Sequence, residues 1–177
     1  RCLDFILEGV DPDGTISRPI NLIIPLTRVN MASQLCTIIE SLLPSLEKIH
    51  DEKELECVFL FCLMWSLGGT VVDAERVRFD QFVKTITTLK VVDNSGNPEA
   101  FIPSGSYPKA FTLYEYFFDT THHQWKHWES VVPDYHAPSD GNFSSILVPT
   151  IDTERYSFLL KTVLSVNKPV LFVGDPG

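Results

Sequence analysis

The sequence is poor in basic residues and in long hydrophobic runs. Lys and Arg number 14 against 23 Asp and Glu, which gives a formal net charge of −9 over 177 residues. Attraction to polyphosphate needs a cationic surface, so this balance argues against a general nucleic-acid-binding protein. The strongest apolar run, residues 57–65, is well short of the roughly 20 residues that cross a bilayer as a helix. We therefore expect this run to be a buried helix and expect no membrane partner.

Cysteine is also scarce, and the four residues are too few for a small disulfide scaffold. Cys36, Cys57 and Cys62 lie in apolar segments of helical character, where a thiol packs like a small hydrophobic side chain. We expect reduced thiols and a cytosolic-type compartment. The sequence does not open with a signal peptide, so the glycosylation sequon at residues 142–144 is expected to be a chance match.

What the sequence does contain is enough apolar material to fold, with 44% hydrophobic and 21% charged residues. In its first half the apolar residues recur at three- and four-residue steps, which is typical of amphipathic helices. We predict helices over residues 2–8, 26–46, 52–67 and from residue 73 to about 89. These helices would make residues 1–90 a small helical domain.

Capping and helix-breaking residues predict where these helices end. Asn30 and Asp73 are expected as N-caps, and Pro44 is expected to end or kink its helix. Gly68 and Gly69 are expected to stop the preceding helix in a left-handed conformation. The buried face of the last helix is expected to carry Val77, Phe82, Val83, Ile86 and Leu89.

Helical periodicity stops near Val92, where residues 93–98 and 103–108 are rich in turn formers. Residues 107–128 then contain eight aromatic side chains, which bury much area with few rotatable bonds. This density favours short strands, or a connector that packs on a neighbour through its aromatic residues. We place a domain boundary near Val92 and assign residues 91–147 to the connector.

The last segment carries the most specific pattern. Asp152 is expected to cap a helix that runs to about Val166, with Phe158, Leu159, Val163 and Leu164 facing inward. Residues 169–173 form a continuous β-rich run, as in a buried parallel strand. Gly174, Asp175, Pro176 and Gly177 then occupy the first four positions of the phosphate-loop pattern G-x-x-x-x-G-K-[ST]. Half of this pattern is also compatible with a plain turn.

Histidines and acids in other places suggest metal sites only weakly. His123 and His127 stand four residues apart beside His122, but no Cys lies nearby and the H-E-x-x-H pattern is absent. A solvated turn flanked by aromatic residues is the simpler interpretation. Asp11 and Asp13 resemble the start of a calcium-binding loop. We reject a calcium site here because apolar residues stand where the further oxygen ligands are needed. We name no catalytic or metal-binding residue.

Several stretches together resemble one family, the dynein heavy chain. They are residues 59–69, 78–82, 114–119 with Trp125 and Trp128, and 146–156 leading to 169–174. The resemblance covers nearly the whole chain in the family's order. Residues 121–128 are more similar to axonemal heavy chains than to the cytoplasmic one, which implies a cytoskeletal protein of the cytoplasm and of motile cilia or flagella.

The resemblance implies an α+β chain in three parts. Residues 1–90 would be the helical lid of the second AAA+ module, and residues 91–147 would be an aromatic-rich connector with short strands. Residues 148–177 would be the first helix and strand of the third module's α/β P-loop core. In this family the second module is thought to bind ATP without hydrolysing it, while the third hydrolyses nucleotide and regulates the first.

The same resemblance implies ATP or ADP with Mg²⁺ as cofactor of the parent chain. Val148, Pro149 and Thr150 match the stretch that lines the adenine pocket, and Gly174, Asp175, Pro176 and Gly177 match the start of the phosphate loop. The Lys and the Ser or Thr that complete this loop, the Walker B acids and the arginine finger of the third module are absent from these residues. We therefore expect no ATPase activity from the isolated chain, because phosphoryl transfer needs these groups together.

The function implied is mechanical: a lid that moves with nucleotide state, and an aromatic connector that passes the motion to the next module. Partners would be the neighbouring AAA+ modules and, through the parent chain, microtubules and dynein light and intermediate chains. Two alternatives stay open. One is a non-catalytic interaction domain in which residues 107–128 dock a partner. The other is a different AAA+ ring ATPase, such as a midasin-like protein.

Overall fold

The computed structural model describes residues 1–47, 49, 51–135, 146 and 148–172, and it combines helices with short strands, as the sequence predicts. Most of the helices expected from the apolar periodicity are present within a few residues of their predicted ends. In the described residues the α-helices are α1 (Cys2–Glu8), α2 (Arg28–Leu46), α3 (Glu52–Ser66), α4 (Asp73–Ile86) and α5 (Ile151–Leu164).

The strands of the described chain all lie between residues 90 and 127, after the first four helices. They are β1 (Lys90–Val92), β2 (Ile102–Pro103), β3 (Ser106–Pro108), β4 (Tyr116–Asp119) and β5 (Gln124–His127). β1 pairs in parallel with β3, while β2, β5 and β4 form an antiparallel sheet in which Phe118 lies opposite Trp125. Three short 3₁₀ helices accompany them: η1 (Gly68–Thr70), η2 (Leu113–Glu115) and η3 (Trp128–Val131).

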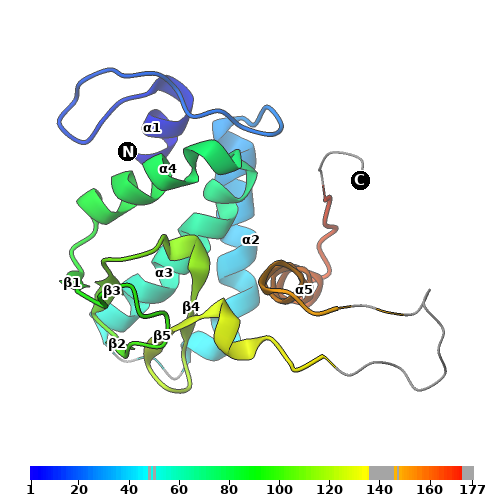
Figure 1. The fold of residues 1–177 in the computed structure, drawn as a ribbon. Coiled ribbons are helices and arrows are strands. Elements are labelled where there is room, and N and C mark those ends of the chain that lie inside the picture. The colour runs from blue at the N-terminus through cyan, green and yellow to red at the C-terminus, as the bar shows by residue number, and fades with distance from the viewer. Residues whose placement is uncertain (48, 50, 136–145, 147, 173–177) are drawn as a thin grey trace.

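Helix α3 lies at the centre of the molecule (Figure 1). It packs against α2, η1 and η2, and against strands β3 and β4. Helix α1 packs against α4 at one end of the molecule, and α5 lies beside α2 and η3. The strands therefore cover a part of α3 that α2 leaves open, and α5 joins the rest of the chain at the edge of this cover.

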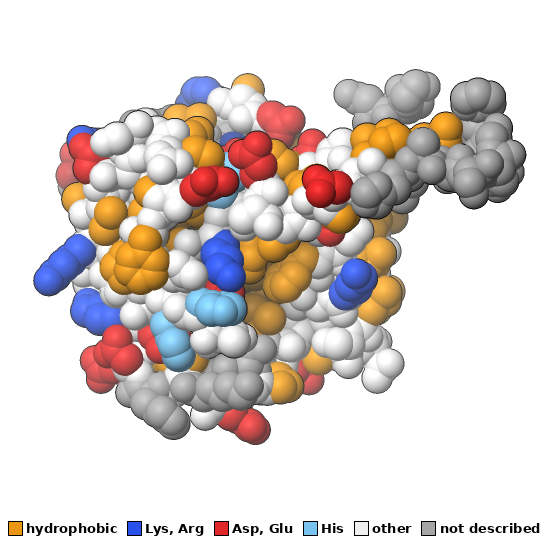
Figure 2. Space-filling model, turned by 60° about the horizontal axis from the view of Figure 1, so that its bottom comes forward, with side chains coloured by type: hydrophobic (Ala, Val, Ile, Leu, Met, Phe, Trp, Pro, Cys, Tyr) orange, Lys and Arg blue, Asp and Glu red, His pale blue; other side chains and the backbone are white. Residues whose placement is uncertain are grey.

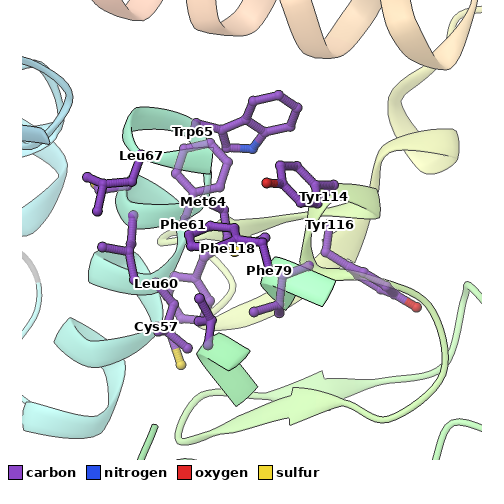
Figure 3. Close-up of a cluster of buried hydrophobic side chains, with 14 of the residues drawn as sticks. Cys57, Leu60, Phe61, Met64, Trp65, Leu67, Phe79, Tyr114, Tyr116 and Phe118 are labelled. Atoms are coloured by element: carbon purple, nitrogen blue, oxygen red, sulfur yellow. The ribbon is translucent and has the colours of Figure 1, made fainter. Parts of the chain in front are cut away.

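The core is built mainly from α3 and from aromatic side chains that face it (Figure 3). Met64, Phe79 and Tyr116 are fully buried, and Trp65 stands edge-on to the Tyr114 ring with 5.5 Å between centroids. The Tyr114 hydroxyl donates a hydrogen bond of 2.9 Å to the Gly68 carbonyl. The aromatic connector and the helices therefore share one core, as expected for a segment that packs on a neighbour through its aromatic residues.

Three predicted N-caps are wrong, because the observed N-caps are Thr27, Val72 and Thr150. Thr27 caps α2 and Asn30 completes the capping box from the third helical position. Asp73 is the first residue of α4 and forms an ion pair with Arg76 at 2.9 Å. Thr150 caps α5 in place of Asp152. Pro44 lies inside α2 without ending it, since near the helix end it removes only one backbone hydrogen bond.

Helix α3 ends just before Gly68 and Gly69, as predicted, but the expected left-handed conformation of these glycines is wrong. The glycines continue into the 3₁₀ helix η1, and neither has a positive φ. A Cβ on Gly68 would meet the Tyr114 hydroxyl, and it would lie 2.6 Å from Phe79 Cε1. Position 68 therefore requires glycine because a larger side chain would clash with its neighbours, and not because of its backbone conformation. A Cβ on Gly69 would have no neighbouring atom within 4 Å, so position 69 is free of this constraint.

Two side chains predicted to face inward are exposed. Val77 on α4 is 53% exposed and Leu164 at the end of α5 is 51% exposed. On α4 the buried face is carried by other positions, since Phe79, Phe82 and Val83 are buried. Ile86 and Leu89 do pack with the core, as do Phe158, Leu159 and Val163 on α5.

The strand predicted over residues 169–173 is not formed in its described part, residues 169–172. Leu171 and Phe172 are 80% and 59% exposed. A strand is held by backbone hydrogen bonds to neighbouring strands, and no strand of the described chain lies beside this segment. No described helix is both long enough and apolar enough to span a membrane.

We predict that Gly68→Ala lowers the free energy of unfolding by about 2 kcal/mol, because the added methyl group must displace the Phe79 and Tyr114 rings in a packed core. Urea unfolding followed by tryptophan fluorescence measures the loss. Gly69→Ala is the matched control and should change stability by less than about 0.5 kcal/mol. Equal effects of the two substitutions would contradict the steric explanation.

Candidate functional site

Three of the residues assigned to a nucleotide site stand immediately before α5. Val148 is 51% exposed, and Thr150 forms a reciprocal capping box with Thr153. The Thr153 amide donates to the Thr150 hydroxyl at 3.2 Å, and the Thr150 amide donates to the Thr153 hydroxyl at 2.7 Å. Thr150 is thus fixed at the start of α5, with Val148 and Pro149 directly before it. Gly174, Asp175, Pro176 and Gly177 lie outside the described residues.

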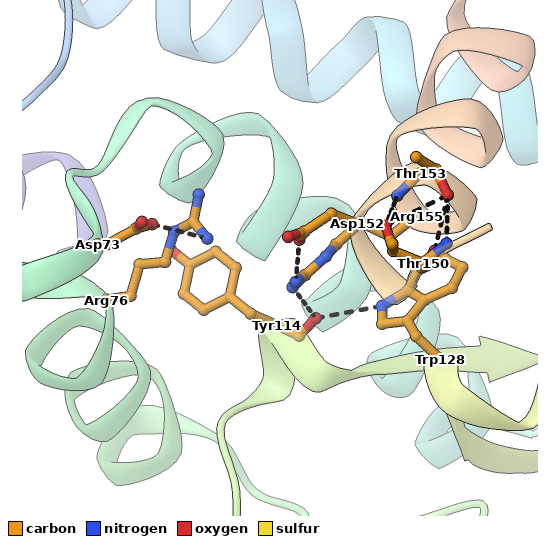
Figure 4. Close-up of polar contacts among 8 residues, drawn as sticks. All are labelled: Asp73, Arg76, Tyr114, Trp128, Thr150, Asp152, Thr153 and Arg155. Carbon is orange, nitrogen blue, oxygen red and sulfur yellow. Dashed lines mark hydrogen bonds and ion pairs between the residues drawn. The ribbon is translucent and has the colours of Figure 1, made fainter. Parts of the chain in front are cut away.

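Helix α5 is attached to the rest of the chain at one backbone carbonyl, that of Tyr114 (Figure 4). The Arg155 guanidinium donates to this oxygen at 3.3 Å, and the Trp128 indole N–H donates to it at 3.1 Å. Arg155 is buried and also forms an ion pair with Asp152. A buried arginine is stable only when its charge is paired and hydrogen-bonded, so this contact fixes the position of α5.

Aromatic side chains surround this polar contact. Phe158 of α5 packs edge-on against Trp128 and against Phe61 of α3, with ring centroids 5.5 and 5.9 Å apart. Tyr156, also on α5, stands edge-on to Trp65 at 6.3 Å. The apolar rings exclude water from the hydrogen bonds to the Tyr114 carbonyl. The junction therefore combines buried area with directional polar contacts.

A second arginine reaches the same junction from α4. The Arg76 guanidinium lies 5.1 Å from the centroid of the Tyr114 ring, which is a cation–π distance. Burial opposes the charge on Arg76, but its interactions with Tyr156 and with Asp73 raise its pKa above the ordinary value. For the Tyr114 phenol, burial is the main cause of a raised pKa. Both groups keep one protonation state at neutral pH.

Beside this junction is a groove of about 680 Å³ between α2, α5 and residues 168–172. Tyr156, Leu159 and Val163 of α5 line it, together with Trp65 and Arg76 from the helical part. Its described lining includes cationic side chains but neither Asp nor Glu. One face of α5 therefore lies on the core while another borders open space.

The three histidines considered for zinc have separate partners. His122 pairs with Asp119 at 2.7 Å, and His123 contacts Glu54 of α3. His127 packs against the Tyr116 ring, and its burial lowers its pKa below the ordinary value. Among the residues that the structure describes, no group of three or more His, Cys, Asp or Glu side chains is arranged to hold a metal ion.

All four cysteines are free thiols, as expected. Cys57 and Cys62 are buried, which raises the pKa of their thiols to about 11 and about 12. Cys36 is exposed on α2, against the expectation that it packs as a core residue. Its segment is amphipathic, and position 36 falls on the outer face of the helix.

Charges of both signs are mixed on the visible surface of the molecule. On the face drawn in Figure 2, Lys and Arg side chains stand apart from one another, Asp and Glu are interspersed with them, and hydrophobic side chains gather between. Lys126 pairs with Asp119 at 2.6 Å and Lys109 with Asp93 at 3.1 Å. On this face the described cations are dispersed and do not form one continuous basic surface.

The residues that fix α5 were not identified from the sequence. Arg155 has no special spacing, and the acceptor at Tyr114 is a backbone carbonyl that carries no side-chain signal. Tyr114 and Arg155 both lie within the stretches that resemble the dynein heavy chain, and this resemblance is the only sequence signal that includes them.

Comparison with known proteins gives two adjacent family matches. The family described as "Dynein heavy chain AAA lid domain" matches residues 2–130, and "P-loop containing dynein motor region" matches residues 135–177. The flagellar inner arm I1 dynein-1-alpha heavy chain of Chlamydomonas reinhardtii is 40% identical over 99% of this chain, and human dynein axonemal heavy chain 10 is 37% identical over 99%. The chain spans 4% of the length of each of these relatives.

We predict that Arg155→Met loosens α5 from the rest of the chain, because it removes a buried charged hydrogen bond that contributes about 1–3 kcal/mol. Amide hydrogen exchange should speed up at least tenfold over residues 151–164, with little change within α3. Lys161→Met removes a positive charge from the exposed side of the same helix and is the matched control. Unchanged exchange in Arg155→Met would show that the apolar contacts alone hold α5.

Proposed function

Since this chain belongs to the dynein heavy chain family, we propose that it is the joint between two consecutive AAA+ modules of an ATP-driven microtubule motor. Residues 1–90 serve as the lid of one module, and residues 148–177 begin the α/β core of the next. The segment between them transmits movement of the lid to the following module.

The observation that carries this proposal is the attachment of α5 at the Tyr114 carbonyl. Residue 114 belongs to the segment matched as a lid, while Arg155 belongs to the segment matched as a P-loop motor region. Trp128 donates to the same oxygen from the end of the lid segment. A rotation of the lid would therefore displace α5 with it, since buried, packed contacts transmit displacement with little deformation.

The open face of α5 supports the second half of the proposal. The groove of about 680 Å³ exposes apolar side chains of α5 and leads to residues 168–172. This is the side on which the remainder of a parallel α/β core would pack, and its strands would supply the hydrogen bonds that Val170 and Leu171 lack here. The run 169–173 would then point residues 174–177 at the phosphates of ATP or ADP, with Mg²⁺.

Val148, Pro149 and Thr150 are proposed to contact the adenine base. The supporting observation is that Val148 is half exposed two residues before Thr150, which is fixed at the start of α5 by its capping box with Thr153. An apolar side chain in a fixed position at the edge of a P-loop core suits a planar base. The parent chain would act with its neighbouring modules, with microtubules and with the light and intermediate chains of an axonemal dynein, in a cilium or flagellum.

An independent docking role for residues 107–128 is less well supported. Tyr114, Tyr116, Trp125 and Trp128 are buried in the chain's own core. Side chains already buried in this way are unavailable to a partner.

We predict that Arg155→Met in the complete heavy chain slows microtubule gliding at least threefold while leaving nucleotide binding at the following module within twofold. The reason is that the substitution weakens the joint but touches no residue assigned to the nucleotide. Gliding velocity and binding of a fluorescent ATP analogue are measured on the same preparation, with Lys161→Met as control. Normal gliding with a loosened α5 would argue against the coupling role.

We predict that Val148→Asp reduces photolabelling of residues 148–150 by 8-azido-ATP at least fivefold in the heavy chain, because a carboxylate would replace an apolar contact to the base and repel the phosphates. Peptide mapping of the labelled chain makes the measurement specific to this module. Val77→Asp introduces the same charge at an equally exposed position on α4 and should leave labelling unchanged. Equal labelling in both variants would rule out the adenine assignment.

A further inference from the structure

Two charged side chains of α4, Asp80 and Lys84, are buried where this helix meets the connector. Asp80 is 3% exposed, and its carboxylate lies 2.9 Å from Lys84 Nζ, one helical turn further along. Only 13% of the Lys84 side chain is exposed. An ion pair taken out of water is stable only when its remaining hydrogen-bonding groups are also satisfied. The other contacts of Asp80 and Lys84 therefore show which part of the chain this pair holds.

Both side chains reach the connector just before Tyr114. Asp80 Oδ1 accepts a hydrogen bond of 2.7 Å from the Leu113 amide, and Lys84 Nζ donates one of 2.8 Å to the Phe111 carbonyl. Leu113 is buried and begins η2, and the first amide of a helix has no acceptor within that helix. Since η2 also has no side-chain N-cap, the Asp80 carboxylate supplies the acceptor that this buried amide needs.

The backbone at Phe111 has a conformation that needs support from outside its own segment. Its φ is +66°, in the left-handed region that a bulky side chain rarely adopts. Such a conformation persists only where surrounding contacts hold it. The hydrogen bond from Lys84 to the Phe111 carbonyl is a contact of this kind. The pair on α4 therefore fixes the path of the chain over residues 111–113.

The carbonyl that holds α5 comes directly after this path. Tyr114 is the next residue along the chain, and its carbonyl accepts the hydrogen bond from Arg155. Among the residues that the structure describes, the side-chain hydrogen bonds and the ion pair of Asp80 and Lys84 go to each other and to the connector, and not to α5. An effect of this pair on α5 is therefore expected to pass through the position of the Tyr114 carbonyl.

We propose that Asp80 and Lys84 are positioning residues for the joint: by holding residues 111–113, they place the Tyr114 carbonyl where Arg155 reaches it. The mechanical consequence rests on the proposed function, since movement of α4 would then reach α5 through this pair. The positioning itself is a statement about geometry, and it can be tested without measuring the activity of the motor.

The test measures amide hydrogen exchange in the purified heavy-chain motor, peptide by peptide. Asp80→Ala should speed exchange over α5 at least fivefold and Lys84→Met at least threefold, while exchange in α3 changes less than twofold and shows that the lid is folded. Asp80→Asn keeps an oxygen for the Leu113 amide and should hold exchange over α5 within twofold of the unsubstituted motor. Asp93→Asn is the matched control, since Asp93 also pairs with a connector lysine, Lys109, but both side chains are exposed.

A double variant separates positioning from a general loss of stability. If Asp80 acts through the Tyr114 carbonyl, adding Asp80→Ala to Arg155→Met should speed exchange over α5 less than twofold further, whereas independent sites would multiply their effects. Multiplied effects overturn the proposal, as do equal acceleration in α3 and α5, an Asp80→Asn motor as fast as Asp80→Ala, or unchanged exchange over α5 in both Asp80→Ala and Lys84→Met. Gliding is measured on the same preparations: normal gliding with a loosened α5 would contradict the coupling role alone and leave the positioning role standing.

Discussion

One backbone carbonyl, that of Tyr114, organises the connection between the two parts of this chain. It accepts one hydrogen bond from the Trp128 indole N–H and one from the Arg155 guanidinium. Trp128 lies at the end of the aromatic connector, and Arg155 lies on α5. The ring of the same residue packs against Trp65, and its hydroxyl donates to Gly68. Because these groups are buried, losing any one donor or acceptor would leave another unsatisfied, which makes the arrangement cooperative.

Under the proposed function, this arrangement would make the lid and the first helix of the following module move together. The aromatic connector is no flexible linker, because Tyr114 and Trp128 are buried in one core with the helices. Helix α5 is joined to that core through Arg155 and Phe158, and its other face is left for the module that it begins.

Much of this architecture follows from the sequence because it is encoded locally. Apolar periodicity locates α1 to α4 and α5, and the aromatic density of residues 107–128 indicates short strands packed on a neighbour. The capping assignments failed where two candidate residues stand close together, since only geometry shows whether Thr27 or Asn30 is outside the helix. The β-rich run at residues 169–172 predicts a strand, but a strand forms only beside other strands, and none of the described chain lies there. The acceptor at Tyr114 is a main-chain atom and leaves no pattern in the sequence, and the phosphate-loop assignment of Gly174 and Gly177 stays a prediction.

The most direct measurement of the central claim is an experimental structure of the whole motor ring in two nucleotide states, at a resolution that shows side chains. The account predicts that Arg155 and Trp128 both contact the Tyr114 carbonyl in each state, and that residues 114–130 and 151–164 superpose as one body while the ring around them rearranges. A structure in which α5 separates from Tyr114 in either state, or moves independently of residues 114–130, would contradict it.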